Sequence, residues 1–282
     1  MPPEGLLLVD KQTGMTSHDV VDAVRRVLGT RKVGHAGTLD PMATGLLLVG
    51  VGRATRLLRF LGDLPKTYEG TGGLGVETAT LDADGEVTRT SEVVVTRRAL
   101  EAAAAALVGD SMQRPPAYSA VKVGGRKLYE AARKGEVLEA VPRAIHVEAF
   151  EILTFGSPEF GFRVTCSGGT YVRALVADVG AALGCGAHLG RLRRTAIGPF
   201  DVRDASPPER LGAPLPIERA VAHLPRVDLE EAEEARAAAN GSILAPTGLE
   251  GPYAVFAPDG HLVGVWRDVG AKAKPETVLG SG

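Results

Sequence analysis

The chain has 282 residues, of which 44% are hydrophobic and 23% are charged. These proportions are ordinary for a globular protein and exclude a disordered or fibrous chain. No stretch approaches the roughly 18 uninterrupted apolar residues of a membrane span, and the first residues contain no basic segment or cleavage site of a leader peptide. We therefore expect a cytoplasmic protein with no membrane partner.

Charge is distributed unevenly along the chain. The net charge of −2 argues against a nucleic-acid partner, but residues 23–60 carry seven Arg or Lys against Asp40 alone. Residues 111–134 carry six Arg or Lys, and Glu130 is the one acidic residue among them. A chain that is neutral overall but basic in blocks can bind phosphate along one face, although a solvated charged surface explains each block equally well.

The two cysteines, Cys166 and Cys185, are widely separated and have no Cys-X-X-Cys spacing. This spacing indicates neither a disulfide framework nor a zinc site. We expect both thiols to be reduced, buried and structural.

The first half of the chain predicts strands and helices in turn. Residues 5–9 predict a strand, and the apolar spacing of residues 18–28 predicts an amphipathic helix with Ser17 as its N-cap and Gly29 as its stop. The elements that follow are a buried strand at residues 46–49, a short helix at 53–61, a strand at 68–75 and an alanine-rich helix at 97–107.

In the second half, residues 160–166 predict a strand, and the following turn leads to a helix that Thr170 is expected to cap and Gly184 to end. Strands and helices are mixed without a strict βαβ rhythm, which indicates an α+β fold.

The composition changes where prolines cluster, near residues 206–225, and such clustering is typical of a linker. Beyond it, two short apolar runs flank the turn Pro258-Asp259-Gly260, as in a β-hairpin. We predict a large domain at residues 1–205, a proline-rich linker at 206–225 and a small β-rich domain at 226–282.

The segment from Gly34 to Gly45 contains the clearest candidates for functional residues. It contains three glycines in twelve residues, and Pro41 keeps Asp40 away from helical geometry. The segment therefore predicts a rigid loop that displays the Asp40 carboxylate and the His35 imidazole. On residue types alone, a turn aspartate and a packed histidine are the more common explanation.

Together with further blocks along the chain, this loop resembles the signature of the pseudouridine synthases that act on the T-loop of tRNA. Five other blocks accompany the loop. The first is Val9-Asp10-Lys11 with Gly14-Met15-Thr16-Ser17, and the second runs from Lys66-Thr67-Tyr68 through Leu74-Gly75 and Thr78 to Thr80-Leu81-Asp82. The remaining three are Pro115–Lys122 with Gly125–Tyr129, then Gly169–Arg173, and finally Cys185–Leu189 with Leu192-Arg193-Arg194. Six ordered blocks at compatible spacing make the match specific, and it favours the functional interpretation of Asp40. The family usually has proline where this chain has Gln12, a difference that affects a turn and not the catalytic loop.

The resemblance implies the pseudouridine synthase fold, a mixed and largely antiparallel sheet with flanking helices, followed by a small PUA-like RNA-binding domain. It also implies that the enzyme converts one T-loop uridine of tRNA to pseudouridine by flipping the base, breaking the glycosidic bond and rejoining the base through C5. This isomerisation involves no redox change, so we expect no cofactor and no metal.

Three catalytic residues follow from the resemblance. Asp40 is implied to be the nucleophile or the carboxylate that stabilises the developing sugar cation. Because burial raises the pKa of a carboxyl group, a cation must oppose that effect, and the resemblance assigns this role to Arg173. Tyr68 corresponds to the tyrosine that stacks on the flipped base and can take the proton from C5.

Four substrate-binding residues are implied as well. His35 matches the residue that enters the space vacated in the RNA, and Leu192 matches an apolar contact to the base. Tyr171 is expected to line the same pocket, and Lys66 belongs to the block of Tyr68.

The expected partner is the T-stem-loop of tRNA, bound by a monomer with no obligatory protein partner. A relative that works inside a guide-RNA complex shares the catalytic loop, but this chain has no basic tail suited to such a complex.

Other functions remain open at this stage. A non-catalytic RNA-binding or tRNA-folding protein would carry the same basic blocks without needing Asp40, Tyr68 and Arg173 together. An aspartyl-phosphate hydrolase, suggested by residues 10–14, lacks evident Mg²⁺-binding acids. A dinucleotide turn at residues 50–55 lacks its third glycine.

Overall fold

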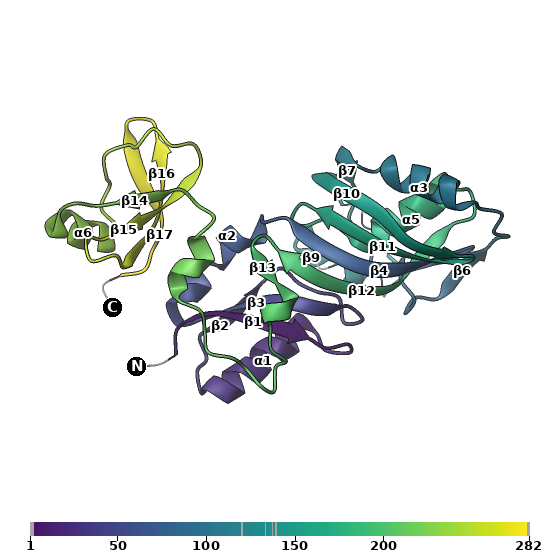
Figure 1. Ribbon diagram of the computed structural model, residues 1–282, viewed down its shortest axis with the longest axis horizontal. Coiled ribbons are helices and arrows are strands. Elements are labelled where there is room, and N and C mark those ends of the chain that lie inside the picture. Colours follow the sequence, from purple (N-terminus) through teal and green to yellow (C-terminus); the bar gives the residue numbers. More distant parts are fainter. Residues whose placement is uncertain (1–2, 120, 133, 137, 139, 281–282) are drawn as a thin grey trace.

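The computed structural model describes residues 3–119, 121–132, 134–136, 138 and 140–280. It is an elongated molecule in which a large twisted sheet extends through most of the length and a smaller sheet stands at one end (Figure 1). Within these ranges, no helix is long and apolar enough to cross a membrane.

The large sheet defines the fold. Its strands are β1 (Gly5–Lys11), β2 (Val33–Ala36), β3 (Thr44–Val51), β4 (Lys66–Leu74), β7 (Gly109–Gln113), β10 (Arg143–Gly156), β11 (Glu159–Cys166), β12 (Ala187–Ile197) and β13 (Phe200–Asp201). Their spatial order is β1-β3-β12-β4-β11-β10-β7, with β2 paired to β3 and β13 to β12. The β12–β3 pair is parallel and the others are antiparallel, which confirms the mixed, largely antiparallel sheet.

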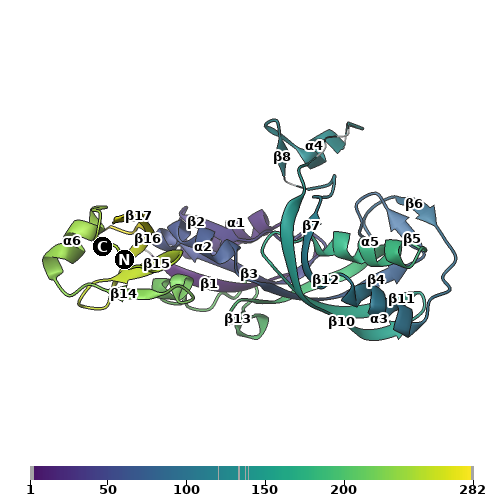
Figure 2. The ribbon, with the colours of Figure 1, turned by 90° about the horizontal axis from the view of Figure 1, so that it is seen from above.

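Helices and two hairpins flank this sheet. The helices are α1 (Ser17–Leu28), α2 (Leu58–Gly62), α3 (Arg97–Ala105), α4 (Leu128–Ala132) and α5 (Val172–Ala182), with 3-10 turns η1 (Gly52–Arg56), η2 (Val202–Asp204) and η3 (Ile217–Val221). The hairpins are β5 (Val76–Thr78) with β6 (Val87–Thr90), and β8 (Lys122–Val123) with β9 (Arg126–Lys127). The segment that carries β8, β9 and α4 projects from the body of the molecule (Figure 2).

The C-terminal sheet has the order β14-β15-β16-β17 and confirms the predicted β-rich end of the chain. Its elements are β14 (Arg226–Asp228), α6 (Ala232–Ala239), β15 (Pro252–Phe256), β16 (Leu262–Val269) and β17 (Lys272–Val278).

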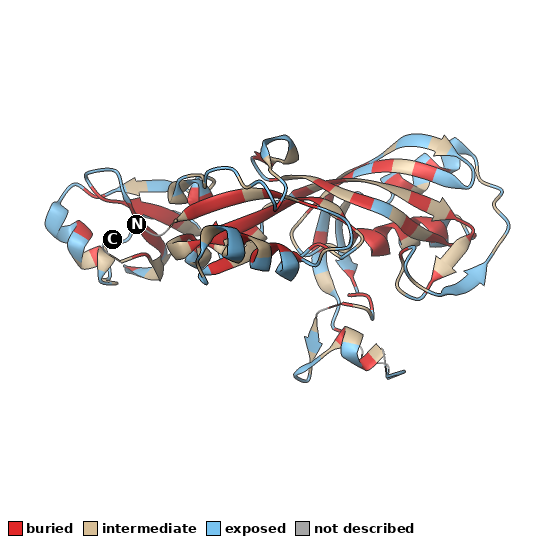
Figure 3. Ribbon diagram, turned by 90° about the horizontal axis from the view of Figure 1, so that it is seen from below, coloured by how far each residue is buried: buried red, intermediate tan, exposed pale blue. Residues whose placement is uncertain are grey.

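Both faces of β1 and β3 are covered, and for this reason residues 46–49 are apolar without alternation. Leu47 faces a cluster that includes Val20 and Val24 of α1. Leu46 faces the opposite cluster, which extends to Phe256 of the C-terminal sheet. Figure 3 shows the buried residues concentrated along the large sheet.

The proline-rich residues 206–225, predicted as a linker, lie against β1. Leu215 and Leu6 exchange two backbone hydrogen bonds of 2.8 and 3.0 Å, and the Ser206 amide donates to the carbonyl of Leu8 at 3.1 Å. Val221 of η3 is buried in the cluster that the C-terminal sheet shares with β1 and β3. The chain between the two sheets is therefore bound to the large sheet along its course.

The predicted caps of two helices are wrong. Thr16, not Ser17, caps α1 through a capping box with Asp19, and the Ser17 hydroxyl instead bonds the backbone of Leu39. The N-cap of α5 is Tyr171, whose amide donates to Gln113 Oε1 at 2.8 Å. In α1 a contact distant in sequence uses the Ser17 hydroxyl, whereas the Thr170 hydroxyl contacts that of Ser167 in the turn before α5.

The expectations for Gly29 and the cysteines are confirmed. Gly29 ends α1 in the left-handed conformation, with φ of 62°. Cys166 and Cys185 are free and buried.

Gly180 allows α5 to pack closely on the start of β12. A Cβ at this position would lie 2.2 Å from the amide nitrogen of Ala187 and 2.3 Å from the carbonyl carbon of Gly186. These are backbone atoms that no rotamer change can move. We expect Gly180→Ala to lower the free energy of unfolding by about 1–3 kcal/mol, measured by urea denaturation, because overpacking outweighs the gain in helix propensity.

The matched control is Gly62→Ala, since nothing lies within 4 Å of a Cβ there. It should leave stability unchanged or slightly higher. Equal stability of the Gly180→Ala and Gly62→Ala proteins would contradict the close packing of α5.

A chain that ends at Pro225 should be less stable than the full chain, although every predicted site residue precedes the cut. The truncation uncovers apolar side chains such as Leu6, Leu46 and Phe60 that the shared cluster buries. Exposure costs about 1.5–3 kcal/mol for each large side chain that becomes fully solvated. Denaturant unfolding of both chains measures the difference, and an unchanged midpoint would show that the two sheets are independent.

Candidate active site

A cavity of about 810 Å³ opens between the loop after β2, the strands β4 and β12, and the N-terminal end of α5. Six of the seven predicted site residues line it, namely Asp40, Lys66, Tyr68, Tyr171, Arg173 and Leu192. His35 does not belong to the lining; it lies on β2, two residues before Gly37, which does.

The Asp40 loop is fixed from behind by a buried lysine. Lys11 at the end of β1 is fully buried, and its Nζ donates to the carbonyls of Met15, Gln12 and Pro41 at 2.6, 3.1 and 3.2 Å. Burial lowers the pKa of Lys11 to about 8, and the negative charge of Asp40 opposes that shift. The backbone on both sides of Asp40 is thus tied to β1 and α1.

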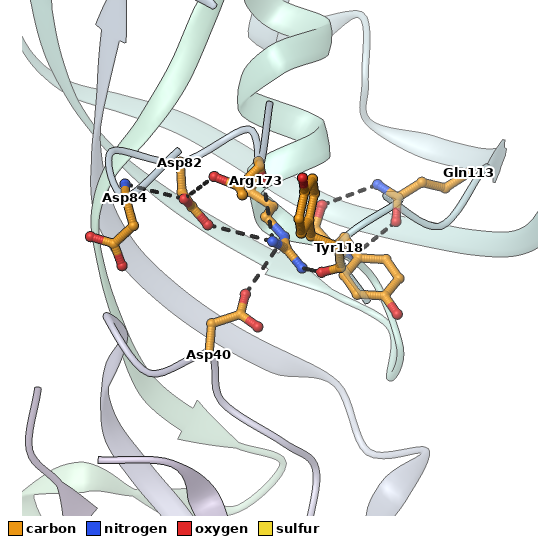
Figure 4. A network of polar contacts seen from close by, with 8 residues as sticks. Asp40, Asp82, Asp84, Gln113, Tyr118 and Arg173 are labelled. Atoms are coloured by element: carbon orange, nitrogen blue, oxygen red, sulfur yellow. Dashed lines mark hydrogen bonds and ion pairs between the residues drawn. The ribbon is translucent and has the colours of Figure 1, made fainter. Parts of the chain in front are cut away.

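Arg173 stands opposite Asp40 and connects four segments (Figure 4). Its Nε lies 3.6 Å from Asp40 Oδ2, and its Nη1 lies 3.4 Å from Asp82 Oδ2. The same guanidinium donates to the carbonyls of Thr80 at 3.2 Å and Tyr118 at 2.6 Å. A single buried cation therefore faces two carboxylates.

Solvent exposure distinguishes these two carboxylates. The side chain of Asp40 is 39% exposed, whereas those of Arg173 and Asp82 are 6% and 8% exposed. Asp82 satisfies the buried charge of Arg173, and Asp40 remains available at the cavity surface.

Sequence reasoning assigned no role to Asp82. Its loop is held by a bridge to Leu189 of β12, and Asp82 Oδ1 accepts hydrogen bonds from the Thr80 hydroxyl and, at 3.3 Å, from the Asp84 amide. The available signal was the block Thr80-Leu81-Asp82, where a carboxylate follows a threonine at hydrogen-bonding spacing.

Tyr171 is oriented from two sides. Gln113 of β7 accepts from its amide and donates to its carbonyl at 3.1 Å. The guanidinium carbon of Arg143 lies 4.6 Å from the centre of its ring, and that of Arg173 lies 5.8 Å away. Sequence reasoning missed Gln113 and Arg143, because nothing local marks either residue.

Tyr68 and Leu192 form the apolar floor. They come from adjacent strands, with Tyr68 opposite Arg194 and Leu192 opposite Gly70 in the β4–β12 register. Both side chains are buried, at 6% and 8% exposure. Burial raises the pKa of Tyr68, while the charge and hydrogen bond of Arg194 act in the opposite direction.

Arg194 and Lys66 are cations held by carbonyl groups. Arg194 is fully buried and donates to the carbonyls of Leu46 at 2.7 Å and Gly37 at 3.0 Å. Lys66 donates to those of Gly62 at 2.7 Å and Leu64 at 2.8 Å, and burial lowers its pKa to about 8.

His35 is half-buried, and its Nδ1 is a buried atom for which the described residues offer no hydrogen-bond partner. Burial, followed by the positive charges of Arg194 and His18, lowers its pKa. The imidazole is therefore neutral at neutral pH.

The described part of the chain contains no group of three or more His, Cys, Asp or Glu side chains that could hold a metal ion.

Protein-family models match nearly the whole chain. The N-terminal domain of the TruB family pseudouridylate synthases matches residues 25–172, the C-terminal domain of tRNA pseudouridylate synthase B matches residues 173–214, and the C-terminal region of tRNA pseudouridine synthase II matches residues 224–280.

Sequence relatives and solved structures agree with these matches. The chain is 45% identical to a tRNA pseudouridine synthase B of Mycobacterium sp. (strain KMS), over 98% of this chain and 96% of the relative. It is 45% identical to that of Thermobifida fusca, over 98% of both chains.

A Cbf5–Nop10–Gar1 complex contains a chain of 27% identity with a TM-score of 0.73, covering 98% of this chain and 84% of that chain. An H/ACA ribonucleoprotein bound to a substrate RNA containing 2′-deoxyuridine gives a TM-score of 0.73 at 25% identity, covering 98% and 85%. The chain belongs to the TruB family of pseudouridine synthases.

Proposed function

We propose that this protein isomerises a T-loop uridine of tRNA to pseudouridine, with Asp40, Tyr68 and Arg173 as its catalytic residues. The observation that carries the proposal is the position of the Asp40 carboxylate, which is exposed to a cavity, faces a buried guanidinium and adjoins an aromatic floor.

The floor suits an extruded pyrimidine. Tyr68 offers a ring face and Leu192 an apolar contact, and stacking on an aromatic side chain is worth about 1–3 kcal/mol per base. This gain offsets part of the few kcal/mol needed to extrude the base from the T-loop.

Asp40 supplies the negative charge that the sugar needs as the glycosidic bond breaks. Whether the carboxylate attacks C1′ or stabilises the sugar cation, it must remain ionised when RNA covers the cavity. Arg173, 3.6 Å away, opposes the rise in pKa that this burial would cause.

Tyr68, as its phenolate, then takes the proton from C5 after the base has been rejoined to the sugar, and becomes a neutral phenol. The Arg194 guanidinium, with its central carbon 6.0 Å from the ring centre, opposes the rise in the pKa of Tyr68 that burial causes and so favours the phenolate that accepts the proton.

His35, Lys66 and Tyr171 are proposed to contact the RNA. Because its imidazole is neutral, His35 can enter the space left in the T-loop without the desolvation cost of a charge. Tyr171 lines the same cavity as Asp40.

We further propose that the protein acts as a monomer without an obligatory protein partner. Its relatives at 45% identity over almost their full length are named tRNA pseudouridine synthase B with no partner protein, whereas the Cbf5 chain at 27% identity is in a complex with Nop10 and Gar1. Light scattering on the purified protein, combined with an activity assay, tests this.

Asp40→Asn should lower the turnover of tritiated C5-uridine tRNA by roughly a thousandfold or more, because the neutral amide cannot act as a nucleophile or counter-ion. Tritium release measures turnover, and filter binding should give an unchanged tRNA affinity. The matched control is Asp201→Asn, which removes a half-buried carboxylate paired with Arg203. Turnover above a few per cent in Asp40→Asn would refute the role of Asp40, whereas absence of tritium release by the unaltered protein would favour a non-catalytic RNA-binding protein.

Arg173→Lys should lower turnover roughly a hundredfold with little loss of stability, because one ammonium cannot reproduce contacts to two carboxylates and two carbonyls. The control Arg203→Lys changes an exposed arginine and should behave like the unaltered protein. Single-turnover kinetics, which separate chemistry from product release, provide the measurement. A normal rate constant would place Arg173 outside the catalytic machinery.

A further inference from the structure

The cavity has an uneven distribution of charge. Asp40, Asp82 and Asp84 contribute to its lining together with Arg173. Lys66 and Arg143 also line it, yet neither forms an ion pair with a carboxylate among the described residues. Cations at the edge of a cavity that have no counter-ion indicate an anionic ligand.

Arg143 has the larger set of unused donors. Its guanidinium is held by stacking on Tyr171, at 4.6 Å from the ring centre, and its Nε is a buried atom without an acceptor. A guanidinium has five N–H groups, and none of those on Arg143 meets an acceptor in the described structure. The aromatic contact fixes the position of the charge while leaving its hydrogen bonds available.

Lys66 has one unused donor. Its ammonium group has three N–H groups, of which two are directed to the carbonyls of Gly62 and Leu64. The side chain is 4% exposed, so the remaining N–H lacks the solvation that a surface lysine has.

The turn Gly168-Gly169 lies between these two cations. The position of a Cβ on Gly168 would be 3.2 Å from Lys66 Nζ, and that of a Cβ on Gly169 would be 3.4 Å from Arg143 Nη1. The backbone amides of both glycines also lack an acceptor in the described structure. The carbonyl oxygen of Gly62 fills the space beside Gly168, 2.3 Å from its Cβ position, so the turn opens to the cavity at Gly169, which belongs to the lining. Two cations that flank a turn with free amide donors are an arrangement typical of phosphate sites.

We propose that Lys66, Arg143 and the Gly168-Gly169 turn bind the RNA phosphodiester that adjoins the extruded nucleotide. This subsite rests on the proposed function, since it requires RNA whose target base enters the cavity. Asp40, Asp82 and Asp84 repel the phosphate, so the backbone leaves the cavity along the cationic wall. The subsite positions the sugar so that C1′ faces Asp40.

The test uses T-stem-loop RNAs with one uncharged methylphosphonate linkage, placed either 5′ or 3′ of the target uridine. The nucleotide before the linkage carries 2′-O-methyl in these RNAs and in the charged reference, which prevents strand cleavage. All proteins carry Asp40→Asn, so the RNA is not converted during the titration. Affinity is measured by fluorescence anisotropy with each separated diastereomer.

One of the two linkages should weaken binding about tenfold when its charge is removed, as expected for a hydrogen-bonded charge pair. The penalty for the same linkage should fall in Lys66→Gln and in Arg143→Gln, each of which keeps one cation, and should be less than about twofold in the double variant, where both charge partners are absent. The matched control Lys272→Gln removes an exposed cation from the C-terminal sheet and should keep the full tenfold effect.

Loss of affinity that persists undiminished in both pocket variants, or tolerance of both neutral linkages, would overturn the subsite. If Lys66→Gln does not fold, as judged by circular dichroism, Arg143→Gln decides the matter, because that residue is only half-buried. The readout is binding and not turnover. Absence of pseudouridine formation would therefore overturn the proposed function alone, and additive binding penalties would overturn the subsite alone.

Discussion

The buried guanidinium of Arg173 is the interaction on which the rest of the site depends. A charge that is 6% exposed is tolerated only when it is paired and hydrogen-bonded, and here Asp82 and two carbonyls satisfy it while Asp40 lies on its open side. Because the partners come from the loops after β2, β5 and β7, the pairing also holds separate segments in register. The same contact thus assembles the cavity and leaves one carboxylate exposed to substrate.

Burial alone does not explain why Asp82 pairs with Arg173 while Asp40 stays exposed to the cavity. Asp82 is enclosed by Thr80 and the turn docked on β12, so its charge serves Arg173. Asp40 precedes Pro41 in a loop whose backbone is tied down by Lys11, and its side chain forms an ion pair with Arg173 but no hydrogen bond within the described part of the chain. A rigid loop with an uncommitted carboxylate is what a nucleophile or counter-ion for a sugar requires.

The sequence was informative where chemistry and local pattern coincide. The helix that ends at Gly29, the strand at residues 46–49 and the α+β class follow from periodicity and glycine chemistry, and the motif blocks pointed to the Asp40 loop. The cap of α1 was missed because the Ser17 hydroxyl bonds the distant backbone of Leu39. The cap of α5 was missed because the Thr170 hydroxyl contacts Ser167 in the preceding turn while the distant Gln113 binds the Tyr171 amide. Local pattern also missed β12, since its pairing with both β3 and β4 is non-local.

The sequence did not predict site residues that belong to no motif and reach the site only through long-range contacts. Arg143 begins β10 and meets Tyr171 only because that strand pairs with β7 and β11, bringing residues far apart in the chain to one edge of the cavity. Its stacked, unpaired guanidinium and the exposure of Asp40 have a common physical origin. The free protein keeps a wall with unused donors and a carboxylate in contact with water, and in the complex that we propose both conditions disappear when a folded RNA covers the cavity. The binding energy of the RNA backbone at the cationic wall can therefore offset the free-energy cost of extruding the base and desolvating Asp40. Only RNA that contacts Asp40 and the cationic wall at the same time would supply the binding energy that catalysis requires.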